Sequence, residues 1–213
     1  MAASNQPGVA SGSPSFDVER DGVAVLTFDA PERSHNVLSS EVMRRLDDAL
    51  RDLEREAAAG RARALVVRSG KPGSFIPGAD VREIAAIDDP AEARAKAAEG
   101  QRIFSRLAAL PIPSVAAVNG ICLGGGTELI LACSRRIAAD SDAVRIGLPE
   151  TRLGIIPGFG GTTRLPRLIG VRAAAELIAS GKPVSARRAH GIGLVDERVP
   201  PELLDQRASA LAR

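Results

Sequence analysis

Two glutamates, Glu128 and Glu150, lie beside glycine-rich segments, where a carboxylate can exchange protons with a bound ligand. Glu128 follows a glycine triplet at residues 124–126, between a predicted strand and a predicted helix. Such a triplet lets the backbone approach a ligand closely with its N–H groups exposed, and the helix adds partial positive charge there. The pattern favours a receptor for a developing oxyanion. It also fits a tight turn in which Glu128 only stabilises the helix dipole.

Glu150 follows Pro149, has apolar neighbours, and precedes a second glycine-rich stretch at residues 157–161. A carboxylate that is partly removed from water has a raised pKa, which suits it to proton transfer. The alternative is a glutamate at a helix start or in an ordinary ion pair. A nucleotide site is not indicated, because the sequence has neither a G-x-G-x-x-G motif in a βαβ context nor a Walker lysine.

A further loop, FIPGADV at residues 75–81, follows a predicted buried strand. We therefore expect its backbone at a strand end, where α/β folds often bind ligands. Ala79 has no side-chain chemistry to offer, so a role for it would come from its N–H. The alternative is a simple turn that contains Asp80.

The elements that must position these residues alternate between strands and helices. Strands are predicted at residues 23–28, 64–68, 114–118 and 136–139, and helices at 39–59, 90–110, 171–180, 185–191 and 201–212, with a further helical segment beginning near 126. This alternation predicts an α/β domain. Residues 1–15 are small, polar and turn-prone, which predicts a disordered N-terminal tail. The remaining residues, 16–213, are expected to form one catalytic domain.

The composition excludes several classes of protein. Aromatic residues make up 2% of the chain and the net charge is +2, so neither a stacking platform nor an electrostatic footprint for nucleic acid is evident. No apolar run approaches the roughly 18 residues of a membrane span. The two cysteines, Cys122 and Cys133, are expected as buried free thiols, and the two histidines are far apart, so no metal site is indicated. We expect a soluble, cytoplasmic protein without a metal.

Three motifs in a fixed order carry a resemblance to a known family. They are FIPGAD at 75–80, AAVNGICLGGGTE at 116–128 and GLPETRLGIIPGFGGTTRLPRLIG at 147–170, and GIGLVDERVP at 191–200 fits the same pattern. From about residue 17 to its end the chain strongly resembles the crotonase (enoyl-CoA hydratase/isomerase) family. It looks most like the hydratase domain of multifunctional fatty-acid β-oxidation α-subunits. The resemblance implies a crotonase/ClpP-like spiral of ββα units.

The resemblance also implies roles for the residues in these motifs. The backbone N–H groups of Ala79 and Gly125 would form an oxyanion hole for the thioester carbonyl of an acyl-CoA. Glu128 and Glu150 would hold a water molecule and pass protons as it adds to the trans-2 double bond of an enoyl-CoA. One oxyanion-hole donor is worth on the order of 3 kcal/mol of transition-state stabilisation. Two carboxylates around one water are expected to titrate as a coupled pair.

Further ligand contacts are implied less directly. Ser34, Asp80 and Val81 would lie near CoA, and Pro149 and Gly158 would line the acyl pocket. No cofactor is expected, because coenzyme A is part of the substrate. Members of the family imply a trimer-based homo-oligomer if C-terminal helices are present, and a thiolase partner if the chain belongs to a multifunctional complex.

The chain departs from the family pattern at three places. Pro77 stands where many relatives have alanine, which removes one N–H from the loop but not that of Ala79. Thr127 stands where an apolar residue or cysteine is usual. The sequence also stops within a helical pattern at residues 201–213, so the C-terminal helical region is expected to be truncated. Two alternatives therefore accompany the hydratase: a Δ3-Δ2-enoyl-CoA isomerase, and a truncated, non-catalytic acyl-CoA-binding module whose incomplete lid leaves the site wet.

Overall fold

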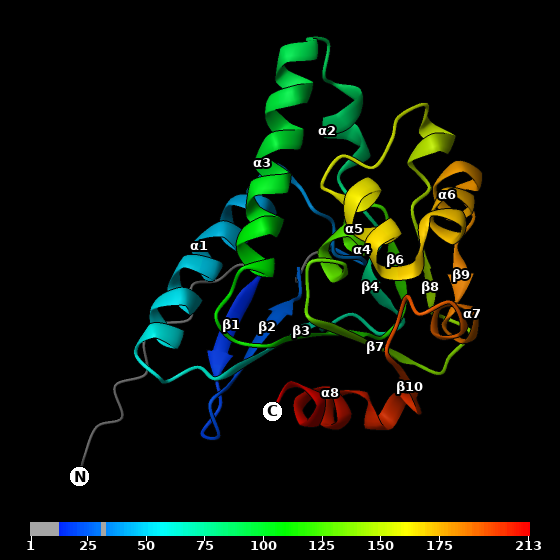
Figure 1. Cartoon of the computed structure of the whole chain (residues 1–213). Coiled ribbons are helices and arrows are strands. Elements are labelled where there is room, and N and C mark those ends of the chain that lie inside the picture. Colours follow the sequence, from blue (N-terminus) through cyan, green and yellow to red (C-terminus); the bar gives the residue numbers. More distant parts are fainter. Residues whose placement is uncertain (1–12, 31–32) are drawn as a thin grey trace.

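The strands of the protein form two sheets. The structure, a computed structural model, describes residues 13–30 and 33–213 (Figure 1). The larger sheet has the order β1-β2-β3-β5-β7-β10 and the smaller has the order β4-β6-β8-β9. The strands are β1 (Ser15–Val18), β2 (Val23–Phe28), β3 (Ala64–Ser69), β4 (Ser74–Ile76), β5 (Ser114–Val118), β6 (Ile121–Leu123), β7 (Arg135–Ala139), β8 (Arg145–Gly147), β9 (Val184–Ser185) and β10 (Glu197–Val199).

The chain builds both sheets at once by repeating one step. It lays β3, β5 and β7 in parallel in the larger sheet, and the strand after each of these, β4, β6 or β8, in parallel in the smaller sheet. Helical segments follow each pair of strands. This is the predicted spiral of ββα units, and the α/β class is confirmed. The strands of the smaller sheet have only 3 residues each in β4, β6 and β8, which is too short for a visible period in the sequence.

Helices cover the sheets and close the core. They are α1 (Ser40–Ala58), α2 (Val81–Ala85), α3 (Pro90–Ala108), α4 (Gly125–Ile130), α5 (Gly161–Ile169), α6 (Val171–Ser180), α7 (Ala186–Gly191) and α8 (Leu204–Ala212), with 3-10 turns η1 (Glu150–Leu153) and η2 (Pro201–Leu203). Helix α1 begins as predicted, because the Ser39 hydroxyl accepts the N–H of Val42 at 3.3 Å. Its buried stripe contains Leu46 and Leu50. Helix α8 packs across β3, β5 and β7, on the lower side of the larger sheet in Figure 1.

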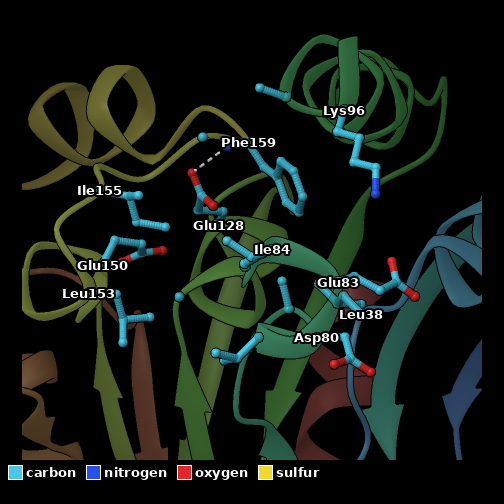
Figure 2. Close-up of a pocket in the computed structure, with 18 of the residues that line it drawn as sticks. Leu38, Asp80, Glu83, Ile84, Lys96, Glu128, Glu150, Leu153, Ile155 and Phe159 are labelled. Atoms are coloured by element: carbon cyan, nitrogen blue, oxygen red, sulfur yellow. Dashed lines mark hydrogen bonds between the residues drawn. The ribbon is translucent and has the colours of Figure 1, made fainter. Parts of the chain in front are cut away.

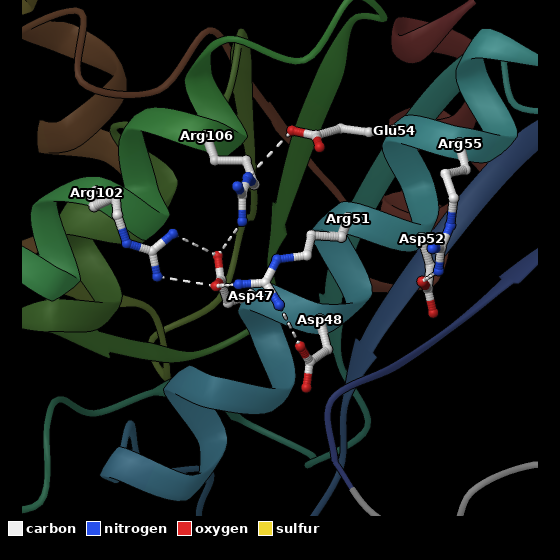
Figure 3. Close-up of polar contacts among 8 residues, drawn as sticks. All are labelled: Asp47, Asp48, Arg51, Asp52, Glu54, Arg55, Arg102 and Arg106. Atoms are coloured by element: carbon white, nitrogen blue, oxygen red, sulfur yellow. Dashed lines mark hydrogen bonds and ion pairs between the residues drawn. The ribbon is translucent and has the colours of Figure 1, made fainter.

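Helices α1 and α3 are joined by a group of ion pairs that we call the Asp47 cluster (Asp47, Arg51, Arg102 and Arg106; Figure 3). Asp47 lies on the buried face of α1 with 4% of its surface exposed. Its two carboxylate oxygens accept hydrogen bonds from the Arg102 guanidinium at 3.0 and 2.9 Å. Arg106, also from α3, pairs with the same carboxylate, as does Arg51 of α1. The cluster therefore fixes α3 against α1 beside the core.

The elements predicted from the longer patterns are present, and their ends shift by a few residues. The predicted segment near residue 126 is the short helix α4, and the predicted helix at 201–212 begins as the 3-10 turn η2. Helices α2 and α5, the 3-10 turn η1 and the strands β1, β4, β6, β8, β9 and β10 were not predicted. Of the predicted tail, residues 1–12 lie outside the described residues, whereas Ser15 begins β1.

Two further expectations concern cysteines and hydrophobic helices. Cys122 and Cys133 are buried free thiols, as predicted. Across residues 13–30 and 33–213, none of the helices combines the length and the apolar character needed to cross a membrane.

Candidate active site

A pocket of about 400 Å³ opens between α2, α3, η1 and the loops that precede α4 and α5 (Figure 2). Helix α2 follows the loop that carries Ala79, and α4 begins within the glycine triplet, so two of the predicted motifs meet here. The third motif supplies η1 and the loop at residues 157–161. Glu128 and Glu150 both line the pocket. The spiral therefore gathers all three sequence motifs around one cavity.

Ala79 is held in place by hydrogen bonds that the backbone groups of its two neighbours, Gly78 and Asp80, make with Leu38. The N–H of Leu38 donates to the carbonyl of Gly78 at 3.0 Å, and the N–H of Asp80 donates to the carbonyl of Leu38 at 3.2 Å. Leu38 and Ala79 thus form an isolated parallel bridge. Because successive residues of extended backbone direct their polar groups to opposite sides, the N–H of Ala79 is directed away from Leu38. Ala79 itself lines the pocket.

The glycine triplet forms the start of α4 and cannot carry side chains. Gly124 has φ +52°, and a Cβ on it would lie 3.1 Å from a carboxylate oxygen of Glu150. A Cβ on Gly126 would lie 2.1 Å from the carbonyl oxygen of Ile76 in β4, so α4 and β4 touch through their backbones. Gly125 is the first residue of α4, where N–H groups have no acceptor within the helix. Gly125 also lines the pocket.

Glu128 lies in the first turn of α4, with 2% of its surface exposed. One of its carboxylate oxygens, Oε1, accepts the N–H of Phe159 and the N–H of Gly161, each at 2.8 Å. Burial raises the pKa of Glu128 to about 7, and the neighbouring charge of Glu150 also raises it, whereas the two N–H groups and Arg164 lower it. Glu128 therefore changes its protonation state near neutral pH while one oxygen stays anchored.

Glu150 is the first residue of η1 and is 8% exposed. Its Oε2 is buried and has no hydrogen-bond partner among the described residues. Burial raises the pKa of Glu150 as well. A buried carboxylate oxygen without a partner costs free energy, so this atom is suited to a ligand or a water. Figure 2 shows the Glu128 and Glu150 side chains in the same part of the pocket.

The other residues predicted to contact a ligand divide into two groups. Asp80, Val81, Pro149 and Gly158 all line the pocket. Asp80 also caps α2 by accepting the N–H of Arg82 at 3.0 Å. Ser34 is exposed and lies outside the pocket lining, next to Arg33, which pairs with Asp80 at 3.6 Å.

Sequence reasoning missed several residues of the site. The N–H groups of Phe159 and Gly161 anchor Glu128, and the only signal near them was the glycine-rich stretch at residues 157–161. The apolar wall also includes Leu38 and Ile84. These two side chains come from a loop and from the unpredicted α2, so no sequence pattern indicated them.

Within the part of the chain that the structure describes, no group of three or more histidine, cysteine, aspartate or glutamate side chains could hold a metal ion. The pocket is lined by two carboxylates, by the backbone of Ala79 and Gly125, and by apolar side chains. Such a set can polarise a carbonyl group and move protons on the atoms beside it.

Comparison with known proteins places this geometry in a family. Residues 18–213 match the family model described as enoyl-CoA hydratase/isomerase. A crystal structure of an enoyl-CoA hydratase from Bacillus anthracis is 40% identical with a TM-score of 0.85, and the match covers 94% of this chain and 75% of that one. The structure of DspI from Pseudomonas aeruginosa is 33% identical with a TM-score of 0.83, covering 96% and 82%. An enoyl-CoA hydratase from Geobacillus kaustophilus is 30% identical with a TM-score of 0.84, covering 92% and 71%. The chain belongs to the enoyl-CoA hydratase/isomerase family.

Proposed function

We propose that this protein hydrates trans-2-enoyl-CoA thioesters to 3-hydroxyacyl-CoA, as a step of fatty-acid β-oxidation. The observation that carries the proposal is the pairing of Glu128 and Glu150 in one pocket. Both carboxylates are buried with raised pKa values, and they line the same cavity as the backbone of Ala79 and Gly125. Two neighbouring carboxylates whose pKa values are raised by burial can take up and release protons, as the addition of water to a double bond requires.

The reaction begins with the thioester carbonyl oxygen between the N–H groups of Ala79 and Gly125. A water held by the glutamates attacks the β-carbon and gives up a proton to one carboxylate. The π electrons move toward the thioester, and the two N–H groups stabilise the enolate oxygen. A proton from the carboxylate pair then reaches the α-carbon, which completes the addition. The two glutamates act as a coupled pair in both proton transfers.

The rest of the substrate follows from the shape of the pocket. CoA extends along the loop of Asp80 and Val81, toward Ser34, and the acyl chain lies against Pro149 and Gly158. The walls there are largely apolar, with Ile84 and Leu153 among them. The carboxylates and backbone donors supply every proton transfer and all charge stabilisation that hydration needs. We therefore propose a reaction without a cofactor, with coenzyme A as part of the substrate.

Loss of the conjugated-thioester absorbance of a short and a medium trans-2-enoyl-CoA tests this proposal. Wild-type protein should consume both, and Glu128→Gln and Glu150→Gln should each lose most of the activity. Glu176→Gln is the matched control, because Glu176 is exposed on α6 and lies outside the pocket lining. Saturable binding of an acyl-CoA without turnover, unaltered in both variants, would instead identify a non-catalytic acyl-CoA-binding module.

The second candidate is Δ3-Δ2-enoyl-CoA isomerisation. It is favoured by Glu128 alone, since one anchored carboxylate with a pKa of about 7 can carry a proton between the α- and γ-carbons. A 3-enoyl-CoA supplied to the same protein separates the two reactions. Fast isomerisation with negligible hydration, and with Glu150→Gln active, would replace the hydratase proposal.

A further inference from the structure

Helix α3 holds the loop that anchors Glu128. The side chain of Gln101 donates a hydrogen bond to the carbonyl of Gly158 at 2.8 Å. The ring of Phe159 packs edge-on against Phe104, with 5.6 Å between the ring centroids. Gly100 makes room for that ring, because a Cβ there would lie 2.2 Å from Phe159. The loop at residues 157–161 thus contacts α3 through two successive residues, Gly158 and Phe159.

Arg164 joins this loop to α3 a third time. It lies near the start of α5, and one guanidinium nitrogen donates to the carbonyl of Phe159 at 3.0 Å. The other terminal nitrogen donates to the hydroxyl of Ser105 on α3 at 3.1 Å. Along the chain, the Phe159 carbonyl lies between the two N–H groups, of Phe159 and Gly161, that hold Glu128. Fixing this carbonyl therefore restricts both donors.

Arg164 also brings a cation close to Glu128 without touching the carboxylate. The guanidinium is partly buried, and this burial lowers its pKa while the charge of Glu128 raises it. The charged groups that act on Glu128 are Glu150 from η1, which raises its pKa, and Arg164 from α5, which lowers it. Arg164 does not belong to the pocket lining. Its effect on a substrate must therefore pass through Glu128 and the loop.

We propose that Arg164 is a positioning residue that holds Glu128 in place for proton transfer, by fixing the Phe159 carbonyl between the two anchoring N–H groups and by supplying a nearby positive charge. The inference rests on the proposed function, because it assigns a purpose to the position of Glu128. It separates the two contributions of one side chain, its hydrogen-bond geometry and its charge. Each contribution is removed by a different substitution.

Three variants and one control separate geometry from charge. Arg164→Lys keeps the cation but cannot donate from two diverging nitrogens, and Ser105→Ala removes the anchor on α3. Arg164→Gln removes the charge. Arg167→Gln is the matched control, since Arg167 is exposed on the same helix.

We expect kcat to fall about tenfold or more in Arg164→Lys and by less in Ser105→Ala, with KM unchanged, because a small misplacement of a catalytic group slows the chemical step. In Arg164→Gln the limb of the kcat profile that reports Glu128 should move to higher pH, because the lost cation had favoured the ionised carboxylate. The pH profile of Arg164→Lys should stay near that of the wild type. Circular dichroism confirms that each variant is folded.

A direct titration makes the inference independent of turnover. Infrared spectra of protein with 13C-labelled glutamate, assigned by comparison with Glu128→Gln, follow the Glu128 carboxylate in the wild type and in the Arg164 variants. An inactive wild type would contradict the proposed function. An upward shift of the Glu128 pKa in Arg164→Gln would still support the inference about Arg164. A normal kcat in Arg164→Lys and Ser105→Ala, or an unshifted Glu128 in a folded Arg164→Gln, would overturn it.

Discussion

Glu128 and Asp47 are two buried carboxylates of one domain, and their partners are opposite in kind. Glu128 accepts two backbone N–H groups and faces a second carboxylate. Asp47 accepts hydrogen bonds from arginines of two helices (Figure 3). The exposed surface is similar, 2% for Glu128 and 4% for Asp47. Burial alone therefore does not decide what each group does.

The two carboxylates have pKa values displaced in opposite directions. For Asp47, burial pushes the pKa upward, but the hydrogen bond from Arg102 and the charges of Arg102, Arg106 and Arg51 hold it below its usual range. For Glu128, burial dominates and the pKa rises to about 7. An ionised carboxylate among arginines ties helices together, whereas one without a directly bonded cation is poised to exchange protons. The charge of the partners separates a structural acid from a reactive one.

The largest difference between substitutions of Glu128 and of Asp47 is expected in turnover. Glu128→Gln should lower kcat on the order of a hundred- to ten-thousand-fold, the usual contribution of a positioned acid–base group. Asp47→Asn should leave kcat within about twofold, because Asp47 lies outside the pocket lining. Steady-state hydration of a trans-2-enoyl-CoA measures both. Equal losses in the two variants would mean that the Asp47 cluster contributes to the pocket.

The next effect concerns stability at neutral pH. Asp47→Ala should lower the free energy of unfolding by about 2 kcal/mol, since it leaves arginines without their carboxylate but partly in water. Because the folded state lowers the pKa of Asp47, this stabilisation is present above its ordinary value of 3.8 and is lost as the pH falls through the folded pKa. Urea unfolding of both proteins at pH 7, and at the lowest pH well below 3.8 at which the wild type still folds, compares the two states. A difference that did not shrink in acid would contradict the ionised assignment.

For Glu128 the sign of the pH dependence is reversed. Its folded pKa is raised from 4.5 to about 7, so the folded state loses stability as the pH rises through this interval. Glu128→Gln keeps an oxygen for the two N–H groups and removes the ionisation. The variant should therefore be more stable than the wild type at pH 8, by at most about 3 kcal/mol, and nearly equal to it below pH 4.5. Melting temperatures at pH 8 and pH 4.5 test this, and a destabilised variant at pH 8 would argue against a raised pKa.

The smallest effects are expected at the rim of the Asp47 cluster. Arg51 is 51% exposed and shares Asp47 with two other arginines, so Arg51→Ala should cost less than about 1 kcal/mol. Arg55→Ala is its control on the same helix, because among the described residues Arg55 pairs only with the exposed Asp52, so its loss should not be measurable. Chemical denaturation of both variants provides the comparison. A large effect in Arg55→Ala would show that surface pairs on α1 also matter.

The same contrast marks what the sequence alone could predict. Glu128, Glu150, Ala79 and Gly125 each lie in a local motif, and all four line one pocket as expected. The Asp47 cluster was not foreseen, because its two partners on α3, Arg102 and Arg106, are 55 and 59 residues from Asp47 along the chain and share no local pattern with it. Helix α2 and the strands of the smaller sheet are too short for a period to appear.

The anchoring of Glu128 could be predicted only in part, for a related reason. The glycine-rich stretch at residues 157–161 indicated a loop, but the side chain that this loop holds depends on where α4 lies in space. The same limit applies to Ser34, whose exposed position outside the pocket follows from the path of the chain before α1. Local sequence patterns identify residues that are able to react, whereas the spiral of ββα units determines which of these residues lie close together.

The bridge between Leu38 and Ala79 bears on how such a pocket could change in evolution. The bridge fixes Gly78 and Asp80 through backbone atoms alone. Side chains along the acyl wall can therefore drift toward new substrates while the N–H of Ala79 keeps its direction. A proline at position 79 would abolish this donor, because proline has no N–H. Selection on the chemistry would then act on backbone hydrogen bonds, leaving the neighbouring side chains open to variation.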